Sequence, residues 1–485
     1  MATTGAALTL PLNRAATDPQ TLGDMDALQP QPKSTHANGK PSKVPETAAT
    51  KHHHDHLNIL AEEITTNLPL IPLDEGARVK VTTSALELAS LVRPPVDLIM
   101  GLFCSMSIVS AVRLFLHWGA FEAIPAGEGE KISYSDLGRR VGAEEGLLVR
   151  IANMLTAASI LTHHPGVTGI SPPSVSHTPF SRLLLPNQPL RAMFSVLYTN
   201  IIHVSTILPE YFDLYGRREP QGLGHIPISF LEGHPEDDYF SLLSRDEKRM
   251  QEFMLAMGIG TRRVPVVGVY DMERVLGLVR DRAAGEKGSG IVWVDVGGGD
   301  GHTVKEFLGV YGERGLKAEE CVVQDLEMVV KAAKKKVEKE GDEELMRVKW
   351  VVMDFMKEAP VEGALVYYLR HILRDYSDPV AVTILRNVAR ALTNPDGRVL
   401  IAEQINPDPL APTDPSSGSP ATGNKPPIPL YAAFKDYAML SIGGKERSLA
   451  QFEAVADAAG LKISAVFQDK ATPHGVIELV LKDRL

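Results

Sequence analysis

The spacing of hydrophobic and polar residues changes once along this chain, near residue 290. From about residue 57 to 260, apolar residues recur at intervals of three and four, which is typical of amphipathic helices. Beyond residue 290, short apolar runs alternate with helical patterns, as in strands that are joined by crossover helices. The pattern therefore predicts a mainly α-helical N-terminal part and an α/β C-terminal part with a parallel sheet.

The α/β part begins with an apolar run that ends in a glycine-rich turn. Such runs predict five strands, at 290–298, 317–326, 348–355, 364–369 and 398–405. Helical patterns predict helices at 302–312, 328–339, 379–392 and 448–460, and two final strands close the chain. Residues 406–429 are rich in Pro, Gly and Ser and are predicted to form a loop. This order predicts a doubly wound, Rossmann-like α/β domain of roughly 200 residues.

The N-terminal helical part contains three recognisable patterns. Residues 111–124 read as an amphipathic helix. Residues 133–161 read as two short helices joined at Gly142 and followed by a third, which is typical of a winged-helix-like unit. Residues 194–216 predict a long helix that is broken near Pro209.

Composition adds a third segment in front of these two. Residues 1–55 are rich in Ala, Thr, Pro and Lys without periodicity, so we expect a disordered extension. The predicted division is thus 1–55, a helical domain at 56–260 and an α/β domain at 261–485. The histidine run His52–His56 lies on the extension, where a flexible chain supplies no fixed ligand geometry, so no metal site is predicted.

Charge and cysteine content restrict the class of protein. The formal net charge of -10 argues against a nucleic-acid-binding surface. Two cysteines, Cys104 and Cys321, cannot form a disulfide framework and fit a reducing compartment. The apolar run 98–112 is short for a membrane span, so it is interpreted as a buried or dimer-interface helix. A cytoplasmic protein without a membrane partner is expected.

The glycine-rich turn at 294–301 is the first candidate binding site. Glycines let the backbone approach a ligand closely, and the free amides of the turn face that ligand. A dinucleotide fingerprint would continue from Gly297 and Gly299 to a glycine at position 302, but His302 stands there. The turn therefore predicts a nucleotide-like ligand other than a dinucleotide.

Two further strand ends carry polar or aromatic residues. Asp325 ends the second strand, where it can accept hydrogen bonds from a ribose diol. Asp354 and Phe355 end the third strand and offer a carboxylate for an amine and a ring for stacking on a base.

These segments resemble an ordered set of family motifs. The stretches VDVGGGDGHTVKEFL, VVQDL, MDF, YYLRHILRDYSD, LIAEQI and GGKERS are similar to those of caffeate-type O-methyltransferases that depend on S-adenosylmethionine (SAM). The stretches HWGAFEAI, SDLGRRVGAEEGLLVRIANML and HTPFSRLLL resemble the dimerisation domain of that family. The resemblance covers roughly residues 95–480 and implies a homodimer, a small-molecule substrate and no metal.

The same resemblance assigns cofactor-binding residues. They are Gly297, Gly298 and Gly299 at the methionine part, Asp325 and Leu326 at the ribose, Asp354 and Phe355 at the adenine, and Arg370 in the place of a lysine.

The resemblance breaks at the catalytic base. Where the family has a histidine before an aspartate, this chain has Arg374 before Asp375. Arginine stays protonated at ordinary pH and cannot act as a base. The two glutamates that flank the family histidine are retained as Glu403 and Glu446. His371 is interpreted as a wall or core residue that does not replace the base.

An Arg-Asp pair also resembles that of the fungal leporin-type pericyclases, which keep the methyl group of SAM. In this interpretation Arg374 polarises a substrate carbonyl, Asp375 orients Arg374 or a substrate hydroxyl, and His203 donates a second hydrogen bond. A satisfied core histidine is an equal interpretation of His203, and His225 is a weaker candidate because it lies in a loop.

The sequence thus predicts a SAM-binding pericyclase that performs a Diels–Alder or retro-Claisen cyclisation of a polyketide or polyketide–peptide intermediate. The alternative is an O-methyltransferase that acts on an acidic enol or phenol. A third class is a non-catalytic regulator that keeps the cofactor fold.

Overall fold

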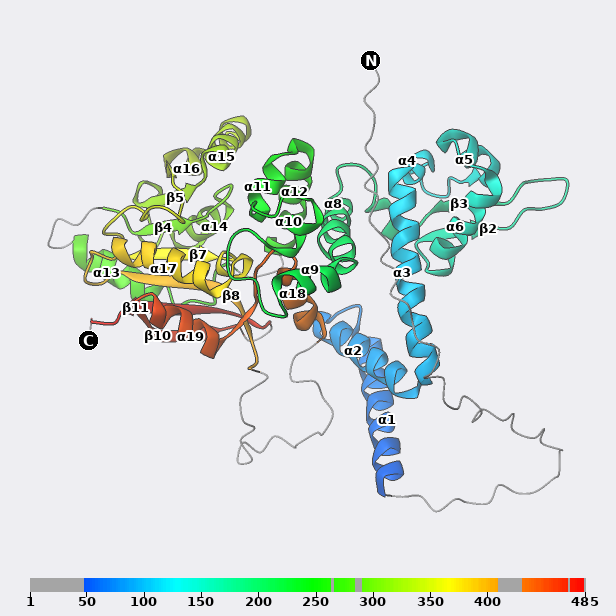
Figure 1. Cartoon of the computed structure of the whole chain (residues 1–485), viewed down its shortest axis with the longest axis horizontal. Coiled ribbons are helices and arrows are strands. Elements are labelled where there is room, and N and C mark those ends of the chain that lie inside the picture. Colours follow the sequence, from blue (N-terminus) through cyan, green and yellow to red (C-terminus); the bar gives the residue numbers. More distant parts are fainter. Residues whose placement is uncertain (1–47, 263–265, 284–289, 409–429, 470–471, 484–485) are drawn as a thin grey trace. The chain divides into compact units, whose positions relative to one another are not determined.

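The computed structural model describes residues 48–262, 266–283, 290–408, 430–469 and 472–483 (Figure 1). The chain divides into two compact units, one up to Ser105 and the other from Met106 onward. Most of the expected N-terminal extension lies outside the described residues. Its last residues are helical, because the first helix begins at Ala48.

The first unit is built on an antiparallel pair of helices. Helix α1 (Ala48–Asn67), the short turn η1 (Leu68–Leu70) and helix α2 (Glu75–Val92) precede the start of helix α3 (Pro95–His117). His56 Nε2 lies 2.9 Å from Glu87 Oε1, and Ser84 Oγ donates to Glu63 Oε2 at 2.7 Å, so polar pairs hold α1 and α2 together.

The first half of helix α3 is exposed, although its apolar composition was compatible with a buried helix. Leu102 and Phe103 are 70% and 65% exposed, and its buried residues begin only at Ala111. By length and composition alone, α3 could cross a membrane, and the bent pair Pro189–His203 and Leu208–Tyr215 could count as a second span. The prediction that this helix is buried within the chain is therefore wrong for its first half. The alternative, that this part of the helix lies in a dimer interface, stays a prediction.

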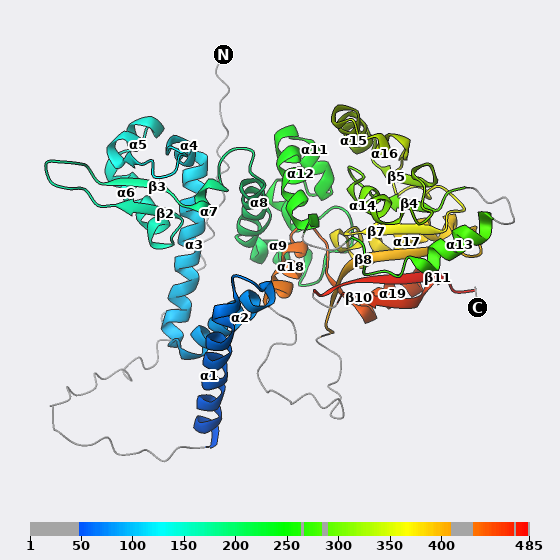
Figure 2. The same ribbon diagram turned by 180° about the vertical axis from the view of Figure 1, so that it is seen from behind.

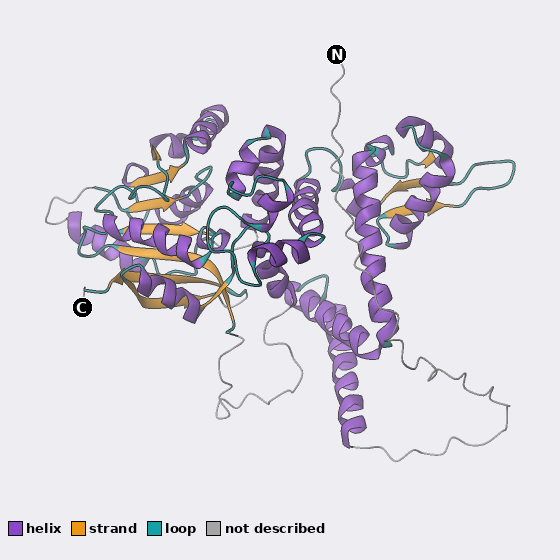
Figure 3. Ribbon diagram, in the orientation of Figure 1, coloured by secondary structure: helices purple, strands orange, loops and turns teal. Residues whose placement is uncertain are grey.

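The second unit opens with a small helical subdomain that contains a three-stranded sheet (Figure 3). Its antiparallel sheet has the order β1-β3-β2, in which β2 pairs with β3. The elements are α4 (Ala120–Ala123), β1 (Ile132–Ser133), α5 (Tyr134–Val141), α6 (Glu145–Ala157), β2 (Leu161–His164), β3 (Ser174–His177) and α7 (Pro179–Arg182). The winged-helix-like unit is confirmed, but its predicted third helix is wrong because that segment continues into β2.

A group of helices follows this subdomain. They are α8 (Pro189–Leu197), η2 (Tyr198–His203), α9 (Leu208–Tyr215), α10 (Pro227–Leu231), α11 (Tyr239–Ser244), α12 (Glu247–Arg262) and α13 (Glu273–Ala283). The predicted long helix is interrupted between His203 and Leu208, so the break precedes Pro209. Proline is tolerated there because it occupies the first turn of α9, where its missing N–H leaves no bond unmade.

The rest of the second unit is the Rossmann-like domain. Its strands are β4 (Trp293–Val296), β5 (Cys321–Asp325), β6 (Lys349–Val352), β7 (Val366–Arg370), β8 (Arg398–Asn406), β9 (Arg447–Ser448), β10 (Leu461–Gln468) and β11 (His474–Leu481). Its helical elements are α14 (His302–Tyr311), η3 (Ala318–Glu320), α15 (Glu327–Glu340), α16 (Glu343–Arg347), η4 (Leu373–Asp375), α17 (Asp378–Ala391), α18 (Leu430–Leu440) and α19 (Leu449–Ala458).

The sheet has the order β10-β11-β8-β7-β4-β5-β6, and helices cover both of its faces (Figures 1 and 2). One core packs α17 and α19 against the sheet, and the other packs α13 and α14 against the opposite face. Strands β6, β5, β4, β7 and β8 are parallel as predicted. The two predicted final strands are present as β10 and β11. Of these, β11 runs against the rest of the sheet, because it pairs antiparallel with both β8 and β10, which places its start beside the end of β8.

The parallel register aligns the strand ends. Trp293 of β4 pairs with Cys321 of β5 and with Val366 of β7. The carboxyl ends of these strands therefore meet at one edge, which is where ligands bind in open α/β sheets.

Candidate functional site

The glycine turn after β4 presents backbone to a ligand. Gly297 has a φ of +73° and Gly299 one of +59°, conformations that glycine adopts without strain. A Cβ atom at Gly297 would lie 2.6 Å from Cδ1 of Ile372, and one at Gly298 would lie 2.7 Å from Cγ of Asp295. Side chains are therefore excluded at these two positions, so the backbone of the turn can approach a ligand closely. The expectation of free amides is wrong for the three glycines, because the N–H groups of Gly297 and Gly298 donate to the carbonyl oxygen of Gln324 and that of Gly299 donates to Asp325.

Asp325 ends β5 and is anchored to the backbone through both oxygens. Its Oδ2 accepts the N–H of Gly299 at 2.9 Å, and its Oδ1 accepts the N–H of Leu326 at 2.7 Å. Burial raises the pKa of Asp325, and these two donors lower it. Each oxygen has a further lone pair, so this fixed carboxylate can still accept the hydroxyls of a ribose.

Asp295 is a candidate cofactor residue that the sequence analysis did not single out. It lies in β4 just before the turn, is 2% exposed, and its Oδ2 has no hydrogen-bond partner among the described residues. Burial raises the pKa of Asp295 to about 7, although His302 and Arg370 lower it. A buried carboxyl oxygen without a partner fits a ligand that brings a cationic group, such as an α-ammonium.

The predicted adenine residues follow β6. Asp354 Oδ1 accepts the N–H of Met356 at 3.0 Å, and its Oδ2 pairs with Nζ of Lys357 at 2.8 Å. Phe355 is half-buried and packs edge-on against Tyr376, with ring centres 6.0 Å apart. The ring is therefore at the same sheet edge as the turn, where a base can stack on it.

Arg370 and Leu326 complete the predicted cofactor set. Arg370 ends β7, is nearly buried, and its Nη1 lies 3.3 Å from Nε2 of His302. Leu326 is 40% exposed beside Asp325. The structure thus brings all eight predicted cofactor residues to the carboxyl edge of the sheet.

The loop after β7 carries the Arg-Asp pair. Nη1 of Arg374 lies 3.3 Å from Oε1 of Glu446, and its Nε lies 3.7 Å from Oδ1 of Asp375. Oε1 of Glu403 accepts the backbone N–H groups of Leu373 at 2.7 Å and Arg374 at 3.2 Å. The arginine, the aspartate and the two predicted glutamates therefore form one cluster.

The carboxyl groups of this cluster titrate at different pH. Burial raises the pKa of Asp375 to about 6, although Arg374 lowers it. Burial and the charge of Glu446 raise the pKa of Glu403 to about 8. Burial also raises the pKa of Glu446, against the effect of Arg374. At neutral pH, Asp375 is mostly ionised and Glu403 mostly protonated, so Asp375 is the carboxyl with a pKa suited to accept a proton.

His371 lies beside the cluster in a strained conformation. Its φ of +56° is in the left-handed region, and its Nδ1 has no partner among the described residues. The ring packs edge-on against His474, with centres 5.2 Å apart. Burial, with Arg374, lowers its pKa well below the usual range, so His371 is neutral and a weak base. This agrees with its interpretation as a wall residue.

His203 and His225 are not joined to the cluster by any described contact. His203 is exposed at the end of η2, and its ring packs edge-on against Tyr198 at 4.8 Å. His225 has a φ of +55°, and its Nε2 lies 3.3 Å from Oε1 of Glu236. The predicted partnership of Arg374 with His203 therefore has no support from side-chain contacts.

Asn200 and Tyr239 form a polar pair close enough to Asp375 to be affected by its charge, and neither residue was predicted from the sequence. Nδ2 of Asn200 donates to Oη of Tyr239 at 2.7 Å. Burial raises the pKa of Tyr239, and Asp375 is among the charges that raise it further. The hydrogen bond thus connects η2 with α11, and Asn200 precedes the predicted His203 by three residues.

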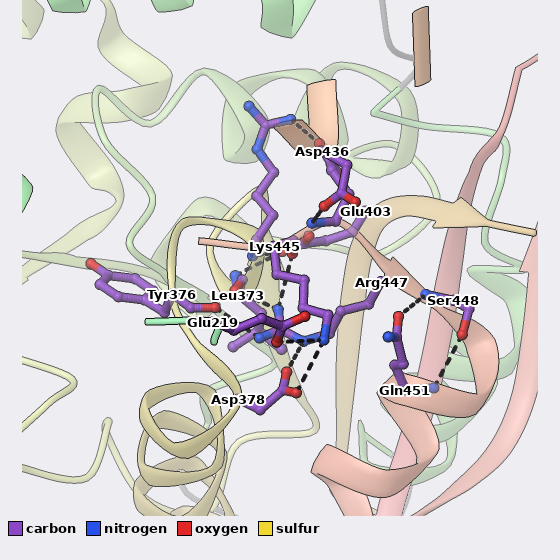
Figure 4. Close-up of polar contacts among 12 residues, drawn as sticks. Glu219, Leu373, Tyr376, Asp378, Glu403, Asp436, Lys445, Arg447, Ser448 and Gln451 are labelled. Atoms are coloured by element: carbon purple, nitrogen blue, oxygen red, sulfur yellow. Dashed lines mark hydrogen bonds and ion pairs between the residues drawn. The ribbon is translucent and has the colours of Figure 1, made fainter. Parts of the chain in front are cut away.

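Arg447 holds the catalytic loop in place (Figure 4). Its guanidinium is fully buried and donates to the carbonyl oxygens of Leu373 and Tyr376, both at 2.7 Å. Its Nε also donates to Oδ1 of Asp378 at 2.8 Å. Bonds on both sides of the Arg-Asp pair fix the backbone between them, which makes Arg447 a positioning residue.

A cleft of about 960 Å³ borders this loop. It is lined by residues of α9, of the segment 217–220, of α18 and of the segment 443–445. Ser377, Asp436 and Lys445 connect it to the catalytic loop, but none of the predicted site residues lines it. The cleft is therefore a neighbour of the site and not the cofactor pocket.

Two regions of the chain match family models of O-methyltransferases. Residues 289–462 match the family model of the O-methyltransferase domain, and residues 96–187 match that of the O-methyltransferase dimerisation domain. "Methyltransferase pynC" of Aspergillus niger is 32% identical over 81% of this chain and 99% of its own length. The second match includes the exposed half of α3, which supports a homodimer.

Two solved structures share the fold. OxaC in complex with SAH and oxaline has a TM-score of 0.71 and 22% identity, over 89% of this chain and 100% of its own. LepI in complex with SAM has a TM-score of 0.68 and 19% identity, over 88% of this chain and 100% of its own. At these identities, the likeness concerns the fold.

Proposed function

This chain belongs to the O-methyltransferase family, and from that premise we propose that it methylates an acidic enol or phenol oxygen of a small fungal metabolite. The observation that carries this proposal is Asp375, a carboxyl with a pKa of about 6 beside the cation of Arg374. It supplies a proton acceptor near neutral pH where the family histidine is missing. The relative pynC, from a fungus, is also named a methyltransferase.

The residues at the edge of the sheet fit SAM as the cofactor. SAM, when bound, supplies an electrophilic methyl group on a positively charged sulfur. Asp295 offers a buried oxygen without a hydrogen-bond partner among the described residues for an ammonium group, and Gly297 and Gly298 leave no side chain between the backbone of the turn and the cofactor. Asp325 is fixed to accept the ribose, and Phe355 offers a ring to the base.

The acceptor side of the site holds and deprotonates the substrate oxygen. Asp375 accepts the hydroxyl proton above its pKa of about 6. Arg374 stabilises the resulting oxyanion, because its buried Nε–H has no acceptor among the described residues. Glu403 fixes the loop through two backbone N–H groups, so this pair is held ready before the substrate arrives.

Cyclisation without methyl transfer is the second candidate. The free Nε–H of Arg374 favours it, since the same donor can polarise a conjugated carbonyl. Two observations rank it below methyl transfer. Glu446 and Asp375 offset the charge of Arg374, and the expected second donor, His203, packs against Tyr198 instead.

The fate of the cofactor separates the two functions. The purified protein is incubated with SAM and a metabolite extract of the producing organism, and S-adenosylhomocysteine and product are followed by mass spectrometry. Methyl transfer yields S-adenosylhomocysteine mole for mole with a methylated product. Product formation with SAM intact would overturn our proposal and favour the cyclase.

Arg374→His adds an independent criterion. This substitution restores the residue of the family pattern beside Glu446 and removes the fixed cation. A methyltransferase keeps turnover in this variant, whereas a cyclase that depends on the guanidinium loses it.

A further inference from the structure

Helix α18 turns one face towards the catalytic cluster. Tyr431, Lys435 and Ala438 are spaced by four and three residues and therefore share a side of the helix. Ala438 is buried on that side. Oδ1 of the adjacent Asp436 accepts the N–H of Glu446 at 2.9 Å, so this part of α18 lies directly against the cluster.

Lys435 is surrounded by groups of the acceptor side. It interacts electrostatically with Glu446 and Arg374, and its charge is among the causes that lower the pKa of His371 and His474. Charges that act on one another in this way lie near each other, so Lys435 borders the acceptor side of the site. Burial lowers its pKa, as does Arg374, while Glu446 raises it.

Lys435 is a cation without a carboxylate partner among the described residues. It is half-buried, and its Nζ lies 5.5 Å from the centre of the Tyr431 ring, which is its nearest described contact. Arg374, by contrast, has Glu446 within 3.3 Å. A partly buried ammonium that forms no salt bridge is costly in the folded protein, unless a ligand supplies a negative charge closer than that of Glu446.

Other buried atoms of the cluster also have no hydrogen-bond partner. These atoms are Nε of Arg374, Nδ1 of His371, Oε2 of Glu403 and Oε2 of Glu446. Such groups are rare in folded proteins, and a cluster of them indicates a place that a polar ligand fills. Two of the available donors, on Arg374 and Lys435, suit an anion whose charge is shared between two oxygens.

We propose that Lys435 recognises the negative charge that the acceptor carries once Asp375 has taken its proton, and that the site therefore takes an acidic 1,3-dicarbonyl enol and rejects its neutral ether. This inference rests on the methyl-transfer function proposed above and names its substrate class. Lys435 is a binding residue in this scheme, since its ammonium donates a hydrogen bond to the enolate oxygen that is not methylated. No bond to Lys435 is formed or broken.

The test compares two small probes that differ in charge. 4-Hydroxy-6-methyl-2-pyrone is an acidic enol, and 4-methoxy-6-methyl-2-pyrone is its neutral ether. Each is titrated calorimetrically at neutral pH into the full-length protein saturated with S-adenosylhomocysteine, so that no turnover occurs. The wild type is expected to bind the enol about tenfold more tightly than the ether, the size of a charge interaction in a partly buried site.

Three variants assign this preference to Lys435. Lys435→Gln removes the positive charge and is expected to lose the preference for the enol over the ether. Lys435→Arg keeps the positive charge and is expected to keep that preference. The control is Lys331→Gln on α15, where an exposed lysine pairs with Glu327 at 2.6 Å. Thermal melting of each variant verifies that it is folded.

The outcomes separate this inference from the proposed function. An unchanged preference in Lys435→Gln overturns the role of Lys435, and a wild type that binds both probes equally, or neither, overturns the anionic substrate class. Either result is compatible with methyl transfer, which is tested by S-adenosylhomocysteine formation. A preference that Lys435→Gln abolishes supports the inference, even if no methylated product forms.

Discussion

The site has two sides that differ in how their polar groups are held. On the cofactor side, which follows β4, β5 and β6, polar groups are hydrogen-bonded to the backbone. On the acceptor side, which follows β7 and β8, charged side chains interact with one another. On the first side, Asp325 accepts two backbone amides and the glycine turn excludes side chains. On the second side, Arg374 faces Glu446 and Asp375. A ligand common to a whole family can be held by fixed backbone geometry, while a substrate particular to one member is selected by charge.

The largest expected effect tests the acceptor side. Asp375→Asn removes the proposed base and should lower the rate of methyl transfer by about 10²–10⁴-fold. In the wild type, a base works when it is deprotonated, so the rate should rise with pH through the pKa of about 6. Rates measured across pH should show that this rising limb disappears in the variant. Asp396→Asn, at an exposed carboxylate before β8, is the control and should leave the pH profile unchanged.

A second substitution tests the cofactor side. Gly298→Ala places a Cβ 2.7 Å from Cγ of Asp295 and forces the turn to shift. Overpacking of this kind costs about 1–3 kcal/mol, so the affinity for S-adenosylhomocysteine should fall by roughly 10–100-fold in calorimetry. Gly309→Ala is a matched control, because its Cβ would meet no atom within 4 Å. Equal affinities in the two variants would contradict the assignment of the turn.

A third substitution asks whether the two sides are independent. Arg447→Lys removes the donors that hold the carbonyl oxygens of Leu373 and Tyr376. The expected fall in kcat is about tenfold, because hydrogen bonds to charged groups contribute about 1.5–3 kcal/mol. The affinity for S-adenosylhomocysteine should not change. Arg386→Lys, which alters an exposed bond to the carbonyl of Ala458, is the control. A matching loss of cofactor affinity in Arg447→Lys would show that the sides are coupled.

The smallest effect concerns the newly identified tyrosine. Tyr239→Phe leaves Nδ2 of Asn200 without its acceptor and should lower the free energy of unfolding by about 1 kcal/mol. Burial raises the pKa of Tyr239, so this residue is neutral near pH 6, the substitution removes no charge from the surroundings of Asp375, and the pH–rate profile should stay unchanged. Denaturant melts and the rate profile test these two expectations. An unchanged profile with lowered stability would confine Tyr239 to a structural role.

The cofactor side was the more predictable from sequence, since its signals are local. A glycine turn after a strand and acids at the next strand ends stand in fixed order along the chain. Asp295 was still missed, because a single acid inside an apolar strand gives no sign that its oxygen lacks a partner. The two final strands were predicted, but the antiparallel pairing of β11 was not, because strand direction depends on pairing and not on composition.

The acceptor side depends on contacts between distant segments. Arg374, Asp375, Glu403 and Glu446 were predicted from motifs, and the structure places them together. Their pKa values could not be predicted, because burial dominates them. His203 was chosen from its position along a helix and stays a prediction, because no contact between it and the cluster is described, while Asn200 of the same segment contacts Tyr239. Helix α18, which brings Lys435 to the site, was not predicted after the Pro-rich loop.

The backbone at position 374 has a consequence for how such a site evolves. Its N–H is accepted by Glu403 and its carbonyl oxygen accepts the N–H of Lys445 at 2.7 Å, while Gly444 leaves no room there for a Cβ. Neither bond involves the side chain of residue 374. A single codon change can therefore exchange the group displayed at this position without rebuilding its support, so one scaffold can pass between a histidine and an arginine and explore a new reaction in one step.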